Sequence, residues 1–312
     1  MEPKKLASFG ELFDQAIAKY KLLWKELVKV VLVPMLAGGV IIALAVLLLV
    51  GGTLEHTSGL FSFGIFAIDF VLGVLAMYIF LTGSIGLMFV IAEGTATQGG
   101  WSGALRRARP LVPSYFVLTF MLCLSMLGGY ALVLIPGIYV SGLLSCAGWV
   151  FLLENKRGWA AITRSAQLAY GRWWPVFGRV CIAGLLAAVV NAILSAILRP
   201  LHIDFIASIV SALVFQPIVV IFVYQLYLSL KETYVETEIS RNEAGFKKQL
   251  TGFMAVGVLG AICFLVLIPV LVTVMTLFVP MLNQVSISTP SFDYASSTYQ
   301  IEAPLATSTL PY

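Results

Sequence analysis

The stretch that decides the fold is LIPGIYVSGLLSCAGWVFLLENKRGWAAITRSAQLAYGRWWPVF, residues 134–177. Its Pro136-Gly137 pair predicts a break between two helices, because proline has no N–H to donate and glycine accepts turn dihedral angles. An apolar run follows and ends at the charged segment ENKR, residues 154–157. An amphipathic segment comes next, and the same order of amphipathic segment and apolar pair recurs along the chain.

The composition predicts a membrane protein. Of the 312 residues, 60% are hydrophobic and 11% are charged, whereas a soluble domain carries about 25% charged residues. Several uncharged runs are longer than the ~18 residues that cross a bilayer as a helix. The predicted class is an all-α, polytopic bundle of about seven transmembrane helices with amphipathic interfacial helices on the cytoplasmic side.

The span boundaries follow from the lengths of the uncharged runs. Residues 111–153 contain no charged side chain, and as one helix they would be ~65 Å long, about twice the hydrocarbon core. They must therefore fold back, and the Pro-Gly pair is the expected place. The membrane domain is predicted over 28–283, with spans at about 28–50, 63–91, 111–135, 138–153, 175–198, 203–230 and 253–279.

Residues 1–27 are predicted to form an amphipathic interfacial helix. Apolar residues recur there at three- and four-residue steps, and Ser8 followed by Glu11 is a capping-box pattern. The helix would lie in the headgroup region or pack on the protein's own cytoplasmic face. Similar basic segments start at Trp101 and at Gly158, the latter with Gly171 as a C-terminal cap.

The basic residues predict the orientation. With a cytoplasmic N-terminus and seven spans, only Arg199 of the 19 Lys and Arg residues falls on the outer side, as the positive-inside rule requires. The C-terminus is then extracytoplasmic. The Ser/Thr/Pro-rich tail, 284–312, is predicted to be disordered.

A threefold repeat is a further prediction. Aligning Trp101 with Trp159 also aligns Arg106 with Arg164, so each repeat would be an interfacial helix followed by two spans. The alternative is that any two basic amphipathic linkers look alike.

Four polar residues are predicted to lie inside spans: Asp69, Asn191, Gln216 and Gln225. They could line a polar pathway, since ionisable groups within a membrane are costly and often functional. They could equally join helices by hydrogen bonds, with Asp69 near the outer interface. The recurrence of Gly184, Ala188, Ala192 and Ala196 every four residues predicts a helix-packing stripe.

Glu154 and Arg164 flank the third cytoplasmic turn and are predicted to form a structural ion pair. As an exposed pair it would contribute under ~1 kcal/mol. No catalytic, cofactor-binding or metal-binding motif is present, and His56 and His202 are expected to be solvated loop residues. The basic residues are dispersed beside apolar spans, which argues against nucleic acid as a partner.

Three segments carry a resemblance to a known family. They are SFGELFDQAIAKYKLLWK (8–25), LIPGIYV (134–140) and FLLENKRGWAAITRSAQLAYGRWWPVFG (151–178), of which the last is the most specific. Over about residues 6–235 the chain resembles the bacterial and archaeal membrane domain found fused to some glycerophosphoryl diester phosphodiesterases. The resemblance implies a protein of a prokaryotic cell membrane. Because the chain has no room for the fused catalytic barrel, the resemblance implies no enzymatic activity.

The expected function is a non-enzymatic envelope or lipid-homeostasis module that has the lipid bilayer as its partner. A transporter or lipid-handling protein with a polar pathway is the alternative. Membrane-protein partners and a homo-oligomer remain open.

Overall fold

The structure is a computed structural model. It describes residues 6–54, 59–94, 99–132, 134–201, 203, 205–233, 247–248, 251–260, 262, 270 and 273–275. By internal contacts the chain divides into Met1–Ile262 and Cys263–Tyr312, and all the helices named below belong to the first unit. The predicted tail, most of the predicted seventh span and both histidines lie outside the described residues.

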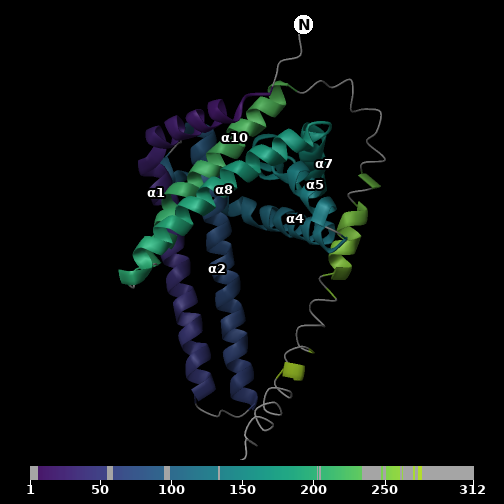
Figure 1. Cartoon of the computed structure of the whole chain (residues 1–312). Helices are drawn as coiled ribbons and strands as arrows, with labels where there is room; N and C mark the ends of the chain where they lie inside the picture. The colour runs from purple at the N-terminus through teal and green to yellow at the C-terminus, as the bar shows by residue number, and fades with distance from the viewer. Residues whose placement is uncertain are drawn as a thin grey trace, which may run out of the picture. The chain divides into compact units, whose positions relative to one another are not determined.

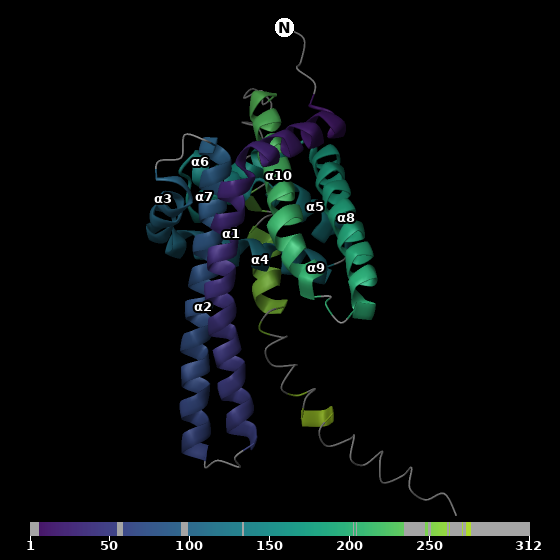
Figure 2. The same cartoon turned by 90° about the vertical axis from the view of Figure 1, so that its left-hand side faces the viewer.

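The first two helices are long and lie side by side. Helix α1 spans Phe9–Leu54 and α2 spans Gly59–Glu93, and they contact each other over much of their length (Figures 1 and 2). At 1.5 Å per residue α1 is about 69 Å long, which exceeds a ~30 Å hydrocarbon core. It runs without interruption through residue 27, where the sequence predicts the end of a separate helix.

Local capping predictions are confirmed at two helix ends. The Ser8 backbone N–H donates to the Glu11 carboxylate at 2.9 Å, and the Glu11 N–H donates to the Ser8 hydroxyl at 3.3 Å, which is a capping box. Gly171 follows α7, Gly158–Ala169, with φ +71°. Glycine has no β-carbon and therefore adopts this left-handed conformation easily.

The predicted hairpin forms, but its break precedes the Pro-Gly pair. Helix α4 spans Val112–Leu132, α5 spans Leu134–Leu144, and the two pack together. Pro136 therefore lies in the first turn of α5, where a helix does not need its N–H. Gly137 lies against the Tyr130 ring of α4, and a β-carbon there would overlap that ring. The glycine thus permits the close approach of the two helices.

The predicted span 138–153 is divided in the structure. Helix α5 ends at Leu144, and a turn at Ser145-Cys146 leads to α6, Ala147–Leu153. The remaining helices follow in chain order. They are α3 (Gly100–Ala108), between α2 and α4, and α8 (Trp173–Leu198), α9 (Phe205–Val210), the π-helical turn Ser211–Phe215 and α10 (Gln216–Glu232) after α7.

Within the described residues, five helical segments are long and apolar enough to cross a membrane: Phe9–Gly51, Phe63–Glu93, Gly100–Tyr130, Trp173–Leu198 and Ile206–Glu232. Two shorter apolar segments are Gly137–Leu153 and Thr251–Gly260. Multi-pass architecture is therefore compatible with the structure, and the count of seven spans stays a prediction.

The main core lies where the N-terminal part of α1 meets the short helices and α10. Its buried members include Leu12, Leu27, Phe151, Ile162 and Phe222. One side of the first part of α1 thus packs on the protein itself, while Leu22 and Trp24 are exposed; placement of this segment in the headgroup region stays a prediction.

Helix α8 contributes little to this core. Only 6% of its most apolar stretch is buried, and Val176 and Ala183 are its buried residues. The predicted packing stripe Gly184, Ala188, Ala192 and Ala196 is exposed. Among the described residues this stripe packs on no other helix, because the neighbouring face of α8, with Val176 and Ala183, is the one that turns inward; packing of the stripe on another chain stays a prediction.

Candidate functional site

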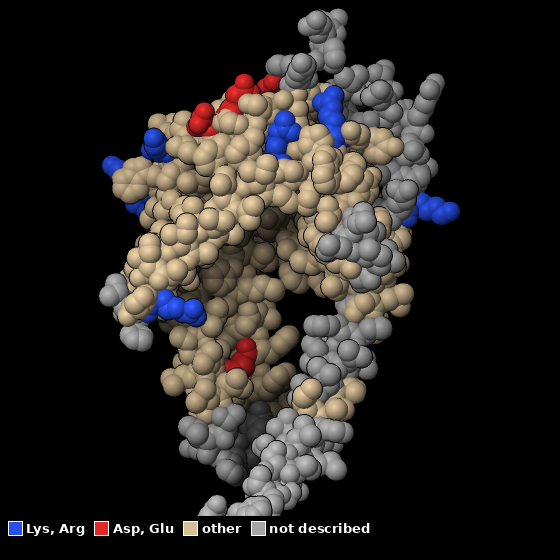
Figure 3. Space-filling model, viewed as in Figure 1, with Lys and Arg blue, Asp and Glu red and all other residues tan. Residues whose placement is uncertain are grey.

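Charged side chains gather at one end of the first unit, as the upper part of Figure 3 shows. We call this region the polar end and define it as residues 6–30, 88–94, 99–111, 151–179 and 224–233. It contains the start of α1, the ends of α2, α6 and α10, and the whole of α3 and α7. Three contacts centred on Glu26, Glu93 and Glu154 join different helices there.

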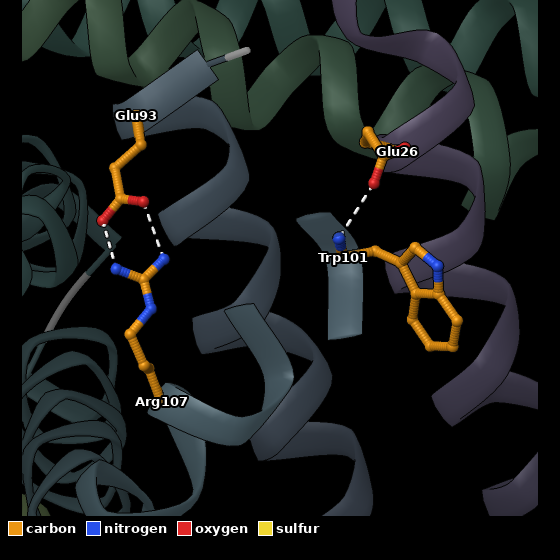
Figure 4. Close-up of polar contacts among 4 residues, drawn as sticks. All are labelled: Glu26, Glu93, Trp101 and Arg107. Carbon is orange, nitrogen blue, oxygen red and sulfur yellow. Dashed lines mark hydrogen bonds and ion pairs between the residues drawn. The ribbon is translucent and has the colours of Figure 1, made fainter. Parts of the chain in front are cut away.

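The first contact joins α2 to α3. Both terminal nitrogens of Arg107 donate to the Glu93 carboxylate at 2.7 Å, and the guanidinium lies 4.9 Å from the centre of the Phe89 ring. Figure 4 shows the two groups facing each other. A two-point contact of this kind fixes the orientation of the arginine as well as its position. The pair is made by Arg107, one residue after the Arg106 that the repeat alignment singled out.

The second contact joins α1 to the start of α3. The Trp101 N–H donates to the Glu26 carboxylate at 2.8 Å (Figure 4). Gly99 precedes the helix and supplies no side-chain cap, so the first N–H groups of α3 need an acceptor from elsewhere. An acid at a helix N-terminus is also favoured by the helix dipole. Glu26 therefore caps α3 from another helix.

The third contact joins α6, α7 and α10 around Glu154. Its carboxylate accepts from Nε of Arg164 at 3.1 Å and from the Tyr227 hydroxyl at 3.0 Å, and the Lys156 ammonium lies 3.8 Å away. The predicted pair is thus present. The pair was expected to be exposed, but the Glu154 and Arg164 side chains are only 13% and 20% exposed. Tyr227 is fully buried and ties the pair to α10.

Two side-chain hydroxyl groups donate hydrogen bonds to backbone carbonyls. Each of these carbonyls lacks the N–H donor that a continuous helix would provide. Ser165 is buried and donates to the Leu143 carbonyl at 2.9 Å, in the last turn of α5, where carbonyls lack helical partners. Tyr20 donates to the Leu213 carbonyl at 3.2 Å. That carbonyl lies four residues before Pro217, which has no N–H to donate.

The four polar residues predicted inside spans are not assembled into one pathway. Gln216 lines a small cavity of about 100 Å³ between α1, α2 and α10, and Gln225 is half-buried farther along α10. Asp69 lies on α2 and Asn191 on α8. Among the described residues, no hydrogen bond joins any two of these four side chains.

Asp69 and Asn191 nevertheless share an unusual feature. Both carboxylate oxygens of Asp69 and the side-chain oxygen of Asn191 are shielded from solvent, and none has a hydrogen-bond partner in the part of the chain that is described. Buried polar atoms are normally paired, so each such exception calls for a physical explanation.

Within the described ranges, no cluster of three or more His, Cys, Asp or Glu side chains could hold a metal ion. No family model, no curated protein and no solved structure matches this chain.

Sequence reasoning found Glu154 and Arg164 but missed Tyr20, Glu26, Glu93 and Tyr227. The partners of Tyr20 and Tyr227 lie 193 and 73 residues away, so no local spacing could indicate them. One signal was available for Tyr20, because Pro217 within an apolar helix leaves a carbonyl that needs another donor.

Proposed function

We propose that this chain is a multi-pass membrane protein that serves as a non-enzymatic module in envelope or lipid homeostasis. Its polar end lies at the cytoplasmic headgroups, the N-terminus is cytoplasmic and the C-terminus is extracytoplasmic. The observation that carries this proposal is that acidic side chains of the polar end bind groups of neighbouring helices. Glu26, Glu93 and Glu154 each bind a side chain or backbone group of another helix, as a structural brace requires.

Surface composition supports the membrane placement. Only 6% of the most apolar stretch of α2, as of α8, is buried, and the exposed residues include Phe66, Phe70 and Leu185. Water-soluble monomers rarely expose apolar patches of this extent, whereas hydrocarbon solvates them.

The position of Asp69 also agrees with this placement. It precedes Glu93 by 24 residues on one helix, which is about 36 Å at the helical rise and slightly more than the ~30 Å hydrocarbon core. With Glu93 at the cytoplasmic headgroups, Asp69 comes to the opposite interface.

Two measurements test the proposal. Reporter fusions at Met1, within residues 234–246 and at Tyr312 should report cytoplasmic, cytoplasmic and extracytoplasmic positions in that order; a cytoplasmic C-terminus would contradict the orientation. Purified protein incubated with phosphodiester and glycerolipid substrates should give no turnover. Turnover that a single substitution abolishes would overturn the non-enzymatic part.

A second candidate, transport or lipid handling, is favoured by the unpartnered oxygens of Asp69 and Asn191. It predicts that Asp69→Asn and Asn191→Leu abolish uptake or lipid flipping in reconstituted vesicles without reducing the amount of inserted protein. Unchanged flux in both variants would remove this candidate.

A further inference from the structure

A cleft of about 420 Å³ lies along the outward face of α7. Its lining includes Trp159, Thr163 and Gln167, at four-residue steps along one side of the helix. The opposite side of α7, which contains Ile162 and Ser165, is buried in the core. The position of the cleft is therefore set by the packing of the helix that forms its floor.

Three cationic side chains line this cleft: Lys156, Arg164 and Lys247. Lys156 comes from the turn before α7, and Lys247 comes from a segment more than 80 positions later in the chain. Cationic residues from three places in the sequence thus converge on one concave surface. Among the described residues, the Glu154 carboxylate lies 3.8 Å from the Lys156 ammonium, and its side chain is 13% exposed.

Glu154 positions one of these cations. It accepts from Nε of Arg164, while its other oxygen accepts from Tyr227. A guanidinium held through Nε keeps its plane in a fixed direction, which suits recognition of a planar or tetrahedral oxyanion. Of the described residues that line the cleft, three are cationic and none is anionic, so this lining is positively charged.

We propose that the α7 cleft binds a phosphate group. Arg164 and the two lysines would surround the phosphate oxygens, and Trp159 would lie beside the attached glycerol or acyl portion. Tryptophan favours the interfacial level of a bilayer, where headgroup phosphates are found. The same chemistry fits an anionic lipid headgroup and a soluble phosphate ester. The lipid source rests on the proposed membrane placement, whereas the soluble source does not.

The test uses the full chain purified in detergent and native mass spectrometry to measure bound ligand. The probes are phosphatidylglycerol, diacylglycerol with the same acyl chains, and glycerol 3-phosphate. The variant is Lys156→Gln/Lys247→Gln, which leaves the Glu154–Arg164 contact in place. At roughly 1 kcal/mol for each basic side chain near an anionic lipid, phosphatidylglycerol should bind about 30-fold more weakly to this variant.

The matched control is Lys21→Gln/Lys25→Gln, which removes the same charge from two exposed positions of α1 and should bind phosphatidylglycerol as the unmodified chain does. Saturable, lysine-dependent binding of glycerol 3-phosphate would support the soluble source. Binding of phosphatidylglycerol but not of glycerol 3-phosphate or diacylglycerol would support the lipid source. Equal weakening in both double variants, or in neither, would overturn the proposal.

Membrane insertion of each variant, measured by resistance to alkaline extraction, separates the two levels of inference. Failure of the unmodified chain to insert would contradict the proposed function. Normal insertion without lysine-dependent phosphate binding would contradict only the cleft.

Discussion

Replacement of Tyr20 by phenylalanine removes one hydroxyl group and leaves the half-buried ring, which packs against the main core. That hydroxyl donates to the Leu213 carbonyl at 3.2 Å, in the π-helical turn before α10. Pro217 follows that carbonyl by four residues and cannot donate to it. In hydrocarbon, where water is absent, such a carbonyl needs another donor. Tyr20→Phe therefore removes a compensating hydrogen bond without opening a cavity.

The expected cost follows from the surroundings of this bond. An unsatisfied buried acceptor costs about 1–3 kcal/mol in soluble proteins, and interhelical hydrogen bonds in membranes average ~0.6 and reach ~1.7 kcal/mol. Leu213 is half-buried, so we expect a loss of about 1 kcal/mol. For a chain of this size, that loss lowers the midpoint of thermal unfolding by about 2–4 °C.

A double-mutant cycle with Pro217→Ala tests the cause. The alanine N–H can donate to the Leu213 carbonyl, so Tyr20→Phe should then cost less than ~0.3 kcal/mol, near the precision of such cycles. Thermal unfolding in detergent, followed by circular dichroism, measures all four chains. Tyr78→Phe, at an exposed position of α2, is the matched control and should show no loss. An equal cost of Tyr20→Phe with and without Pro217 would refute the reasoning.

Three further predictions concern the packing of the polar end and of α4, each measured as a change in the unfolding midpoint. Glu154→Gln removes the carboxylate shared by an arginine and a tyrosine and should lower the free energy of unfolding by about 1–3 kcal/mol. Glu93→Gln acts on a pair that is about a third exposed and should cost under ~1 kcal/mol. Equal costs would contradict the role of burial. Ser165→Ala leaves a carbonyl at the end of α5 without its side-chain donor and should cost about 1–3 kcal/mol; an unchanged midpoint would show that this bond contributes nothing. Gly257, in the helical segment Thr251–Gly260, lies against the backbone of Leu124 in α4, so the β-carbon of Gly257→Ala would overlap it and should cost about 1–3 kcal/mol. Gly252→Ala, with no atom within 4 Å, should be neutral; a neutral Gly257→Ala would contradict this close approach of the two helices.

The predictions of helix capping that are confirmed concern neighbours in the chain. Ser8 and Glu11 are three residues apart, and Gly171 directly follows the C-cap residue of the helix that it ends. Their hydrogen bonds and dihedral angles depend on a few consecutive residues, so sequence spacing is sufficient to predict them.

The hairpin shows how such a local rule can be displaced. A proline was expected to mark the break itself, but the first turn of a helix tolerates it equally well. Helix α5 therefore begins at Leu134, before Pro136. The sequence predicts that the chain turns near this point, and the packing of α5 on α4 decides where the turn occurs.

The direction in which a side chain faces was harder to predict. Asp69, Asn191, Gln216 and Gln225 were grouped because all are polar residues in apolar segments, yet they lie on three different helices without mutual hydrogen bonds. The stripe on α8 was expected to pack and is exposed. A helical repeat shows which residues share a face, but not which neighbour that face meets.

By itself, the amino-acid sequence determined that this chain is helical, that several of its helices are apolar enough for a bilayer, and where some of them are capped. These properties depend on composition and on hydrogen bonds between near neighbours. Only the tertiary structure decided that Tyr227 shares Glu154 with Arg164, that Glu26 caps α3, and that Tyr20 serves the carbonyl before Pro217. Each of these contacts joins a side chain to a group that lies more than 70 residues away in the chain, so it depends on how whole helices pack.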